Sequence, residues 1–395
     1  MRKFESILSA MSSPDARTTQ TGDLHFPKNP SEARERFRRA AEPTGAKLST
    51  RLLPSDKAST PTEELSIEIA ELDPGRERLL VLTSGVHGPE TPAGSRIQEE
   101  FFLHHARRLH EQGWGILAIH GINAWGFLHG RRNNSRNVNL NRNFSLDPAT
   151  FQTRNPGYER LRDFLEPTTP LISVEAEALR LASGIAWRLA RGEMSRSDLA
   201  IAAGMGQYQF PTGLSYGGSG PEPETQIVAE FFQKHLVGER DRVVAIDLHT
   251  GLGSRACLHA ILSDGPSARG MEPMRRRLAS VLKTGEIEIT PTDTAGFYKT
   301  TGDMNDFAAN FCRQAREAIC VTAEFGTIGA DGLNQFRTLL MFIAENRGHT
   351  RGYRRLADAE RLKRLNRELF DPQDRLWQDR VLLRGLTLIE KLTDN

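Results

Sequence analysis

Two side chains that could bind a metal ion stand three residues apart in the segment His87-Gly-Pro-Glu90. Zinc accepts imidazole nitrogen and carboxylate oxygen as ligands at about 2.0–2.2 Å. At this spacing, just after the apolar run 79–82, the two side chains could close on one small cation. The pattern His-x-x-Glu also arises by chance in many chains, so the metal-site hypothesis depends on further ligands elsewhere in the sequence.

Two further ionisable side chains follow short strand-like runs. His249 comes directly after the run 242–248, and Glu324 follows the run 319–322. Because ligands of open α/β sheets gather at the carboxyl ends of strands, we expect both side chains to lie near His87. Two histidines and one carboxylate would give zinc three protein ligands and leave a fourth position for water, which is the pattern of a catalytic site. A further carboxylate could take a proton from that water.

Between these motifs, residues 131–144 form a polar segment rich in arginine and asparagine. A guanidinium group matches a carboxylate through two parallel hydrogen bonds. A substrate that bears a carboxylate would therefore be held well by this segment, whose arginines are Arg131, Arg132, Arg136 and Arg142.

Alternating strand-like and helix-like patterns must position these side chains. Short apolar runs predict strands, and apolar residues at helical spacing predict helices. We expect strands at 48–53, 65–72, 79–83, 114–119, 242–248, 286–289 and 319–325. We expect helices at 30–46, 93–109, 158–195, 225–236, 271–283, 335–345 and in 353–395, with a break near Asp371-Pro372. This order predicts an α/β fold with three α/β/α layers around a central mixed sheet, and with the site at the carboxyl ends of strands.

The chain shows no internal repeat and no low-complexity linker. The simplest division is a loose N-terminal segment (1–29), one catalytic domain (30–350) and a helical C-terminal tail (351–395) that packs on the same domain. Two loop-like segments, 121–157 and 204–223, are expected to wall the cleft.

The composition is that of a soluble globular protein, with 38% hydrophobic and 26% charged residues. The net charge of +2, from 52 basic and 50 acidic residues, gives no reason to expect binding to nucleic acid or to a membrane surface. The N-terminus lacks the apolar core of a secretory signal, and no window approaches the length of a membrane span. Three cysteines without zinc-ribbon spacing favour reduced thiols, so we expect a cytoplasmic protein. The oligomeric state is left open.

Four short motifs occur here in the order seen in zinc carboxypeptidases, an order that aspartoacylase and succinylglutamate desuccinylase share. They are His87-Gly-Pro-Glu90, the pair Asn141-Arg142 in Asn-Leu-Asn-Arg-Asn-Phe, the strand end Asp-Leu-His249, and the late Glu324. The sequence most resembles a bacterial branch of this superfamily that is described as a domain of unknown function. Further matching segments begin at Gly206, Gly213 and Phe370, and the resemblance covers residues 30–395.

The resemblance implies a carboxypeptidase-like fold and a single zinc ion held by His87, Glu90 and His249. It implies that Glu324 acts as general base and then general acid, activating the zinc-bound water. The predicted function is zinc-dependent hydrolysis of an amide or peptide bond in a small or peptide substrate that bears a free carboxylate.

Four further positions are carried over from the resemblance. Arg142, with Asn141, would bind the terminal carboxylate of the substrate. Arg132 would lie near the scissile carbonyl and stabilise its oxyanion, although another arginine of the same segment could serve instead. Tyr298 would match the mobile substrate-binding tyrosine of the family.

One position departs from the family pattern. The family usually has an aspartate two residues before the Asn-Arg pair, where it fixes the tautomer of the first zinc histidine, and this chain has Asn139. An amide oxygen can accept the same imidazole N–H but carries no full charge, so metal affinity or water activation would be weaker.

Other interpretations of these motifs stay open. The chain could be an N-acyl-amino-acid deacylase with the same chemistry, or a zinc-binding module with lost or weak catalysis. His249 could be an ordinary core histidine, and Glu324 could be half of a salt bridge. Ser215 lies in a Gly-x-Ser-x-Gly sequence, but a serine nucleophile there would need a strand before it and a helix after it. A glycine-rich loop that lines the cleft is the better interpretation.

Overall fold

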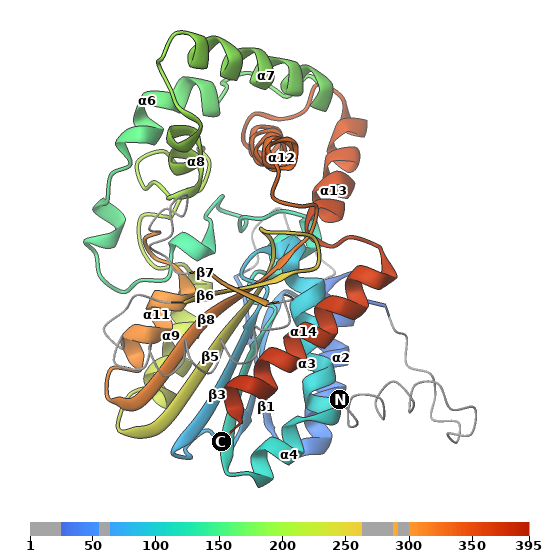
Figure 1. Ribbon diagram of the computed structural model, residues 1–395, viewed down its shortest axis with the longest axis vertical. Coiled ribbons are helices and arrows are strands. Elements are labelled where there is room, and N and C mark those ends of the chain that lie inside the picture. The colour runs from blue at the N-terminus through green and yellow to red at the C-terminus, as the bar shows by residue number, and fades with distance from the viewer. Residues whose placement is uncertain (1–24, 55–63, 263–286, 291–299, 395) are drawn as a thin grey trace.

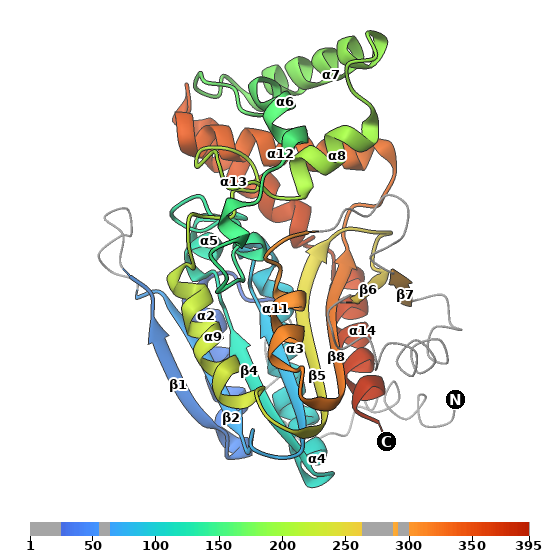
Figure 2. The same ribbon diagram turned by 90° about the vertical axis from the view of Figure 1, so that its left-hand side faces the viewer.

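A twisted sheet of eight strands, in the order β1-β2-β4-β3-β5-β8-β6-β7, forms the centre of the protein (Figures 1 and 2). The computed structural model describes residues 25–54, 64–262, 287–290 and 300–394. Strands β4, β3, β5 and β8 run parallel, β1, β2 and β4 pair antiparallel, and β6 runs antiparallel to β8 and parallel to β7. The sheet is therefore mixed, as the sequence predicts.

The elements have the following bounds. The strands are β1 (Lys47–Leu52), β2 (Ser66–Leu72), β3 (Arg78–Ser84), β4 (Trp114–His120), β5 (Arg240–Gly251), β6 (Leu258–Leu262), β7 (Ile287–Thr290) and β8 (Ala315–Gly326). The α-helices are α2 (Pro30–Ala41), α3 (Thr91–His104), α4 (Ala106–Glu111), α5 (Ala124–His129), α6 (Pro156–Leu165), α7 (Val174–Ala190), α8 (Arg196–Gly204), α9 (Pro223–His235), α11 (Met304–Phe311), α12 (Gly332–Arg351), α13 (Leu356–Phe370) and α14 (Arg375–Thr393). Short 3-10 turns are η1 (Glu42–Thr44), η2 (Gly88–Glu90), η3 (Leu140–Arg142) and η4 (Thr150–Gln152).

Helices cover both faces of the sheet, because successive side chains of a strand point to opposite faces. In β3, Leu80 and Leu82 join a core with residues of α2, α3 and α14. Their neighbours Leu79 and Val81 join a second core with residues of α9 and α11. A strand that is apolar on both faces is typical of a sheet buried between two helical layers. The three-layer α/β/α fold expected from the sequence is confirmed.

A further group of helices, α6, α7, α8, α12 and α13, lies beyond the carboxyl ends of the parallel strands (Figure 1). These helices share a hydrophobic core of their own, which includes Tyr158, Leu181 and Leu362. The helix that follows them, α14, returns to the sheet, and its Trp377 donates an indole N–H to the carbonyl of Gly326 at 2.8 Å. The end of β8 is therefore tied to the last helix of the chain.

Some local predictions were wrong. The segment 121–157 was expected to be loop, but it contains α5, which begins after its N-cap Asn123 and ends at its C-cap Gly130. The helix expected at 93–109 is broken at His105 into α3 and α4. The run 158–195 divides into α6 and α7, because Pro167 and Pro170 lie between them.

Strand β6 and helices α8 and α11 had no predicted counterpart, and the helix expected at 271–283 lies outside the described residues. Within the described part of the chain, no helix combines the length and the apolar character that crossing a membrane requires.

Candidate metal centre

The carboxyl ends of β3, β5 and β8 meet at one edge of the sheet, because these strands are parallel neighbours. His249 and Glu324 pair directly in the register of β5 and β8. His87 follows the end of β3, which pairs with β5 up to Ser84 opposite Leu248. The sheet therefore brings three side chains that are far apart in the sequence to the same edge.

The loop between β3 and α3 carries both His87 and Glu90, and its path depends on a glycine. The turn η2 is followed directly by α3. Each has a proline in its first positions, Pro89 and Pro92, and the fixed φ of proline suits the start of a helix. A Cβ atom on Gly88 would lie 2.0 Å from the carbonyl carbon of Gly126, in the backbone of α5. Only glycine therefore fits at position 88, directly after the candidate ligand His87.

Replacing Gly88 with alanine is expected to lower the free energy of unfolding by about 1–3 kcal/mol and to weaken zinc binding. The new methyl group would meet backbone atoms, which cannot turn away as a side chain can. Chemical denaturation and zinc titration would measure both effects. Gly75 is a matched control, because a Cβ there has nothing within 4 Å. Indistinguishable behaviour of the two alanine variants would contradict this account.

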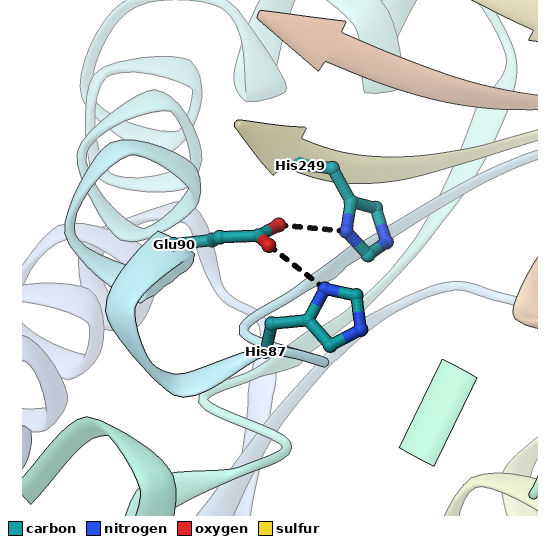
Figure 3. A group of neighbouring side chains, drawn as sticks. All are labelled: His87, Glu90 and His249. Carbon is teal, nitrogen blue, oxygen red and sulfur yellow. Dashed lines mark hydrogen bonds and ion pairs between the residues drawn. The ribbon is translucent and has the colours of Figure 1, made fainter. Parts of the chain in front are cut away.

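Glu90 bridges the two histidines (Figure 3). Its Oε1 lies 2.8 Å from Nδ1 of His87, and its Oε2 lies 2.8 Å from Nδ1 of His249. The main-chain N–H of Thr250 also donates to Oε2, at 3.2 Å. One ligand atom from each of the three side chains lies within 4.8 Å of the others, and all three residues are buried.

The other ring nitrogen of each histidine also has a partner. Nε2 of His87 lies 3.0 Å from Oδ1 of Asn139, and Nε2 of His249 lies 2.6 Å from Oδ2 of Asp247. Both partners are oxygen acceptors, so each Nε2 would donate its proton to them. Once a ring is neutral, its Nδ1 is the nitrogen free to bind a metal ion, and in both histidines Nδ1 faces Glu90.

Burial and neighbouring charges shift the pKa of each group in this centre. Burial lowers the pKa of His87 to about 4, and the charge of Arg132 acts in the same direction. Burial also acts to lower the pKa of His249, but the carboxylates of Asp247 and Glu90 outweigh it and raise the pKa well above its ordinary value. For Glu90, burial acts to raise the pKa, but both histidines outweigh it and lower the pKa. The centre therefore holds an ionised carboxylate beside imidazoles.

The chemistry of the donor set fits a zinc ion. Two ligands at about 2.0–2.2 Å from zinc lie at most about 4.4 Å apart. The contact of each histidine with Glu90 is within that limit, and the three ligand atoms lie within 4.8 Å of one another. Two neutral imidazole nitrogens and one carboxylate oxygen are ligands that zinc prefers in catalytic sites. A cation there would take the place of the protons that now join the three side chains.

Glu324 lies beside His249 in the sheet and is itself buried. Its Oε1 accepts the main-chain N–H of Leu252 at 2.9 Å. Burial raises the pKa of Glu324 to about 7, and the Glu90 carboxylate adds to the rise, whereas His249, the Leu252 N–H and Arg132 oppose it. A carboxyl group with a pKa near neutrality can both take up and release a proton at the working pH. A salt bridge, the simpler role considered for Glu324, is not among its described contacts.

Two of the candidate oxyanion arginines are held by carboxylates. Arg131 is buried and forms an ion pair with Glu345. Arg136 is exposed and forms an ion pair with Glu222 at 2.7 Å. Neither guanidinium is directed at the metal centre by these contacts.

Arg132 is the arginine of this segment whose charge acts on the centre. It lowers the pKa of His87 and opposes the raised pKa of Glu324. Its guanidinium lies 5.0 Å from the centroid of the Phe342 ring. A small cavity beside it is lined by Arg132, Asn133, Leu214, Ser215, Phe342, Glu345 and Asn346. Both segments that were expected to wall the cleft therefore line this cavity, together with α12.

The candidate carboxylate-binding pair has extensive backbone contacts. Arg142 is buried, and its Nε and Nη2 donate to the carbonyl of Gly204 at 3.1 and 2.6 Å, while Nη1 donates to the carbonyl of Asn141. Asn141 accepts the N–H of Met304 through Oδ1, at the first turn of α11. Three of the five guanidinium N–H groups are therefore used within the protein. Tyr298 lies outside the described residues.

Ser215 does not form a nucleophile elbow. It has a left-handed backbone (φ 50°), and its hydroxyl donates to the carbonyl of Ala203 at 2.7 Å. No strand precedes it and no helix directly follows it among residues 205–222. The loop lines the cavity beside Arg132, as expected for this segment.

Asp247 is a site residue that sequence reasoning did not single out. It stands two residues before His249 in β5, so that both side chains lie on the same face of the sheet. The Asp-x-His spacing on a strand was the signal that could have identified it.

The chain aligns with several solved structures at low similarity. Carboxypeptidase A from Helicoverpa armigera is 12% identical, with 94% of this chain and 81% of that chain covered and a TM-score of 0.46. Thrombin activatable fibrinolysis inhibitor is 11% identical, with coverage of 88% and 80% and a TM-score of 0.47. A metallo-carboxypeptidase from Pseudomonas aeruginosa is 13% identical, with coverage of 91% and 69% and a TM-score of 0.41. Similarity at this level does not transfer an activity to this chain.

A search of curated proteins gave no match. One protein family does match, over residues 26–384, and it is described as a protein of unknown function (DUF2817). This match confirms the expected branch of unknown function. The chain therefore belongs to the DUF2817 family.

Proposed function

We propose that the protein is a zinc-dependent amide hydrolase of the carboxypeptidase type, acting on a small substrate that bears a free carboxylate. The proposal depends on one observation above all: His87, Glu90 and His249 converge within 4.8 Å, with Glu324 directly beside His249 in the sheet. Three ligands and an adjacent acid–base group are what hydrolysis by this chemistry requires.

His87 and His249 would hold the ion through Nδ1, and Glu90 through a carboxylate oxygen. When bound, zinc would polarise the substrate carbonyl and lower the pKa of water at the site. Glu324 would take the proton of the attacking water and return it to the leaving amine. Because the Leu252 N–H already binds Oε1, we assign the proton transfer to Oε2 of Glu324.

Arg132 and Arg142 would bind the two polar ends of the substrate. Arg132 would donate to the carbonyl oxygen as negative charge develops on it, which is the largest single term in many acyl transfers. Arg142 has two guanidinium N–H groups beyond the three that it donates to Gly204 and Asn141, and these would meet the free carboxylate. A buried, pre-oriented guanidinium loses little entropy on binding.

Metal analysis followed by a substrate panel would test the proposal. Purified protein should contain about one zinc ion per chain and should hydrolyse dipeptides with a free C-terminal carboxylate, and a chelator should abolish that hydrolysis. Hydrolysis of N-acyl amino acids alone would favour the deacylase alternative. Absence of zinc, or turnover that resists the chelator, would refute the proposal.

The acidic limb of the pH profile is expected to report Glu324. As a base it must be ionised, so kcat/KM should fall with decreasing pH once the pH drops below its pKa. That pKa is about 7 in the protein without metal, and a bound divalent cation would lower it, so the limb should lie at or below that value. Measuring kcat/KM across this range would locate the limb, and a flat profile would count against Glu324 as the base.

A further inference from the structure

The two histidines of the centre have different partners behind them. His87 has the neutral amide of Asn139, at 3.0 Å, and His249 has the carboxylate of Asp247, at 2.6 Å. Both partners are buried, with 0% and 3% of their surface exposed. Acceptors behind a ligating imidazole fix its tautomer and raise its basicity, and a carboxylate does so more strongly than an amide.

The orientation of the Asn139 amide is fixed by a second contact. Its Oδ1 also accepts the main-chain N–H of Asn141 at 3.1 Å, so the oxygen must face both donors. Its Nδ2 is buried and has no hydrogen-bond partner among the described residues. A buried donor without a partner costs about 1–3 kcal/mol, so the amide nitrogen gains nothing at this position. An aspartate at position 139 would keep both acceptor contacts and lose no described hydrogen bond.

Both carboxylate oxygens of Asp247 accept hydrogen bonds. Oδ1 accepts the hydroxyl of Thr83, on the neighbouring strand β3, at 2.7 Å, while Oδ2 faces the ring of His249. Thr83 and Asp247 are paired in the register of β3 and β5. The carboxylate is therefore anchored by the sheet itself and has little freedom to turn away from the imidazole.

We propose that Asp247 is a positioning residue whose carboxylate is the charged hydrogen-bond acceptor behind a ligating imidazole of this centre. It takes the role of the aspartate that the family usually has at position 139, where this chain has asparagine. In this arrangement the charge acts through the second histidine, His249, instead of through the first, His87. One such carboxylate is enough, so Asn139 does not mark a centre that has lost its metal. This inference rests on the proposed function only in requiring that the three ligands bind a divalent ion.

A double-mutant cycle tests the proposal with zinc affinity as the readout. Asp247→Asn is expected to weaken zinc binding by about 10–100-fold, measured by competition with a chromophoric chelator. Asn139→Asp in that background is expected to restore at least about tenfold, because it returns one charge behind an imidazole. In the wild-type background the same change should have a clearly smaller effect. The expected cycle is therefore strongly non-additive.

Nitrogen NMR of the zinc-loaded protein gives a second readout. In the wild-type protein both rings should show a protonated Nε2 and a metal-bound Nδ1, and Asp247→Asn should change the Nε2 signal of His249 without a comparable change at His87. Asp358→Asn is a matched control, because Asp358 is a buried aspartate on α13 and should leave zinc affinity unchanged.

Three outcomes of the affinity cycle would overturn the proposal. Zinc affinity could be unchanged in Asp247→Asn, or Asn139→Asp could improve binding equally in both backgrounds, or it could fail to rescue a folded double variant. If Asp247→Asn does not fold, Thr83→Val removes the anchor and keeps the charge, and it should then weaken zinc binding. A Thr83→Val protein with unchanged affinity would overturn the proposal.

The inference and the proposed function can fail separately. A wild-type protein that binds zinc but hydrolyses nothing on the amide panel refutes the function, and the affinity cycle still decides the role of Asp247. If the protein hydrolyses amides but the effects of the two substitutions are additive, only the proposed role of Asp247 is refuted, and the proposed function stands. Failure to bind zinc at all overturns both.

Discussion

Replacing Glu324 with glutamine is expected to lower kcat by about 10²–10⁴-fold while zinc stays bound. Glutamine keeps the shape of the side chain and can still accept the Leu252 N–H, but it cannot take a proton from water. Since Glu324 is not one of the three converging ligands, the metal content should not change. Steady-state kinetics with the best substrate of the panel, together with zinc analysis of the same sample, would measure both quantities.

Glu368→Gln provides the control for this variant, because Glu368 is an exposed glutamate on α13 and the chemical change is identical. The control should retain the kcat of the wild type. The acidic limb of the pH profile should also be absent from the residual activity of Glu324→Gln. Wild-type turnover in Glu324→Gln would remove Glu324 from the mechanism and leave only its structural contact with Leu252.

Replacing Glu90 with glutamine is expected to weaken zinc binding by at least about 100-fold. This is more than the loss of affinity expected when the acceptor behind a ligating imidazole, such as Asp247, is replaced. Glu90 is the anionic member of the proposed ligand set and contacts both histidines at 2.8 Å. A neutral amide oxygen is a poor substitute for a carboxylate oxygen, although it fills the same space. Zinc content after dialysis and the chelator competition would measure the loss, and hydrolysis should fall in proportion to the zinc content.

Glu99→Gln offers a matched control for Glu90→Gln, since Glu99 lies buried on the adjoining helix α3 but pairs with Arg36 and Arg96 instead of histidines. It is expected to alter stability without altering zinc affinity. If Glu90→Gln bound zinc as tightly as the wild type, the proposed ligand set would be wrong and the three-residue cluster would be a hydrogen-bonded network only.

The residues at strand ends could be predicted from the sequence, because each follows an apolar run and parallel strands bring their carboxyl ends together. This reasoning applies to His249 and Glu324, which were expected at one edge of the sheet, whereas their direct pairing depends on the register of β5 and β8. The contact between Asn139 and His87 was expected only from the family resemblance, because the two residues lie 52 positions apart and no local pattern indicates that they meet. The contact of His249 with Asp247 was not expected, although the two residues lie on one strand.

The arginines illustrate a second limit. Arg131, Arg132 and Arg136 are equivalent in sequence terms, since all lie in one polar segment. The structure distinguishes them by their partners: Glu345 on α12 and Glu222 before α9 bind the first and the third. Long-range ion pairs of this kind have no local sequence signal, and neither does the packing of α6, α7 and α8 on α12 and α13.

Because His249 pairs with Glu324 across β5 and β8, the backbone hydrogen bonds between these strands set the distance between the two residues. Neighbouring strands lie about 4.8 Å apart, and that spacing is a property of the peptide group and not of any side chain. A slip of one residue between the two strands would turn Glu324 to the opposite face, and the cores on both faces oppose such a slip. Sequence changes in the loops and outer helices can therefore alter what enters the cleft while the distance between the proposed metal ligand His249 and the proposed proton carrier Glu324 stays constant.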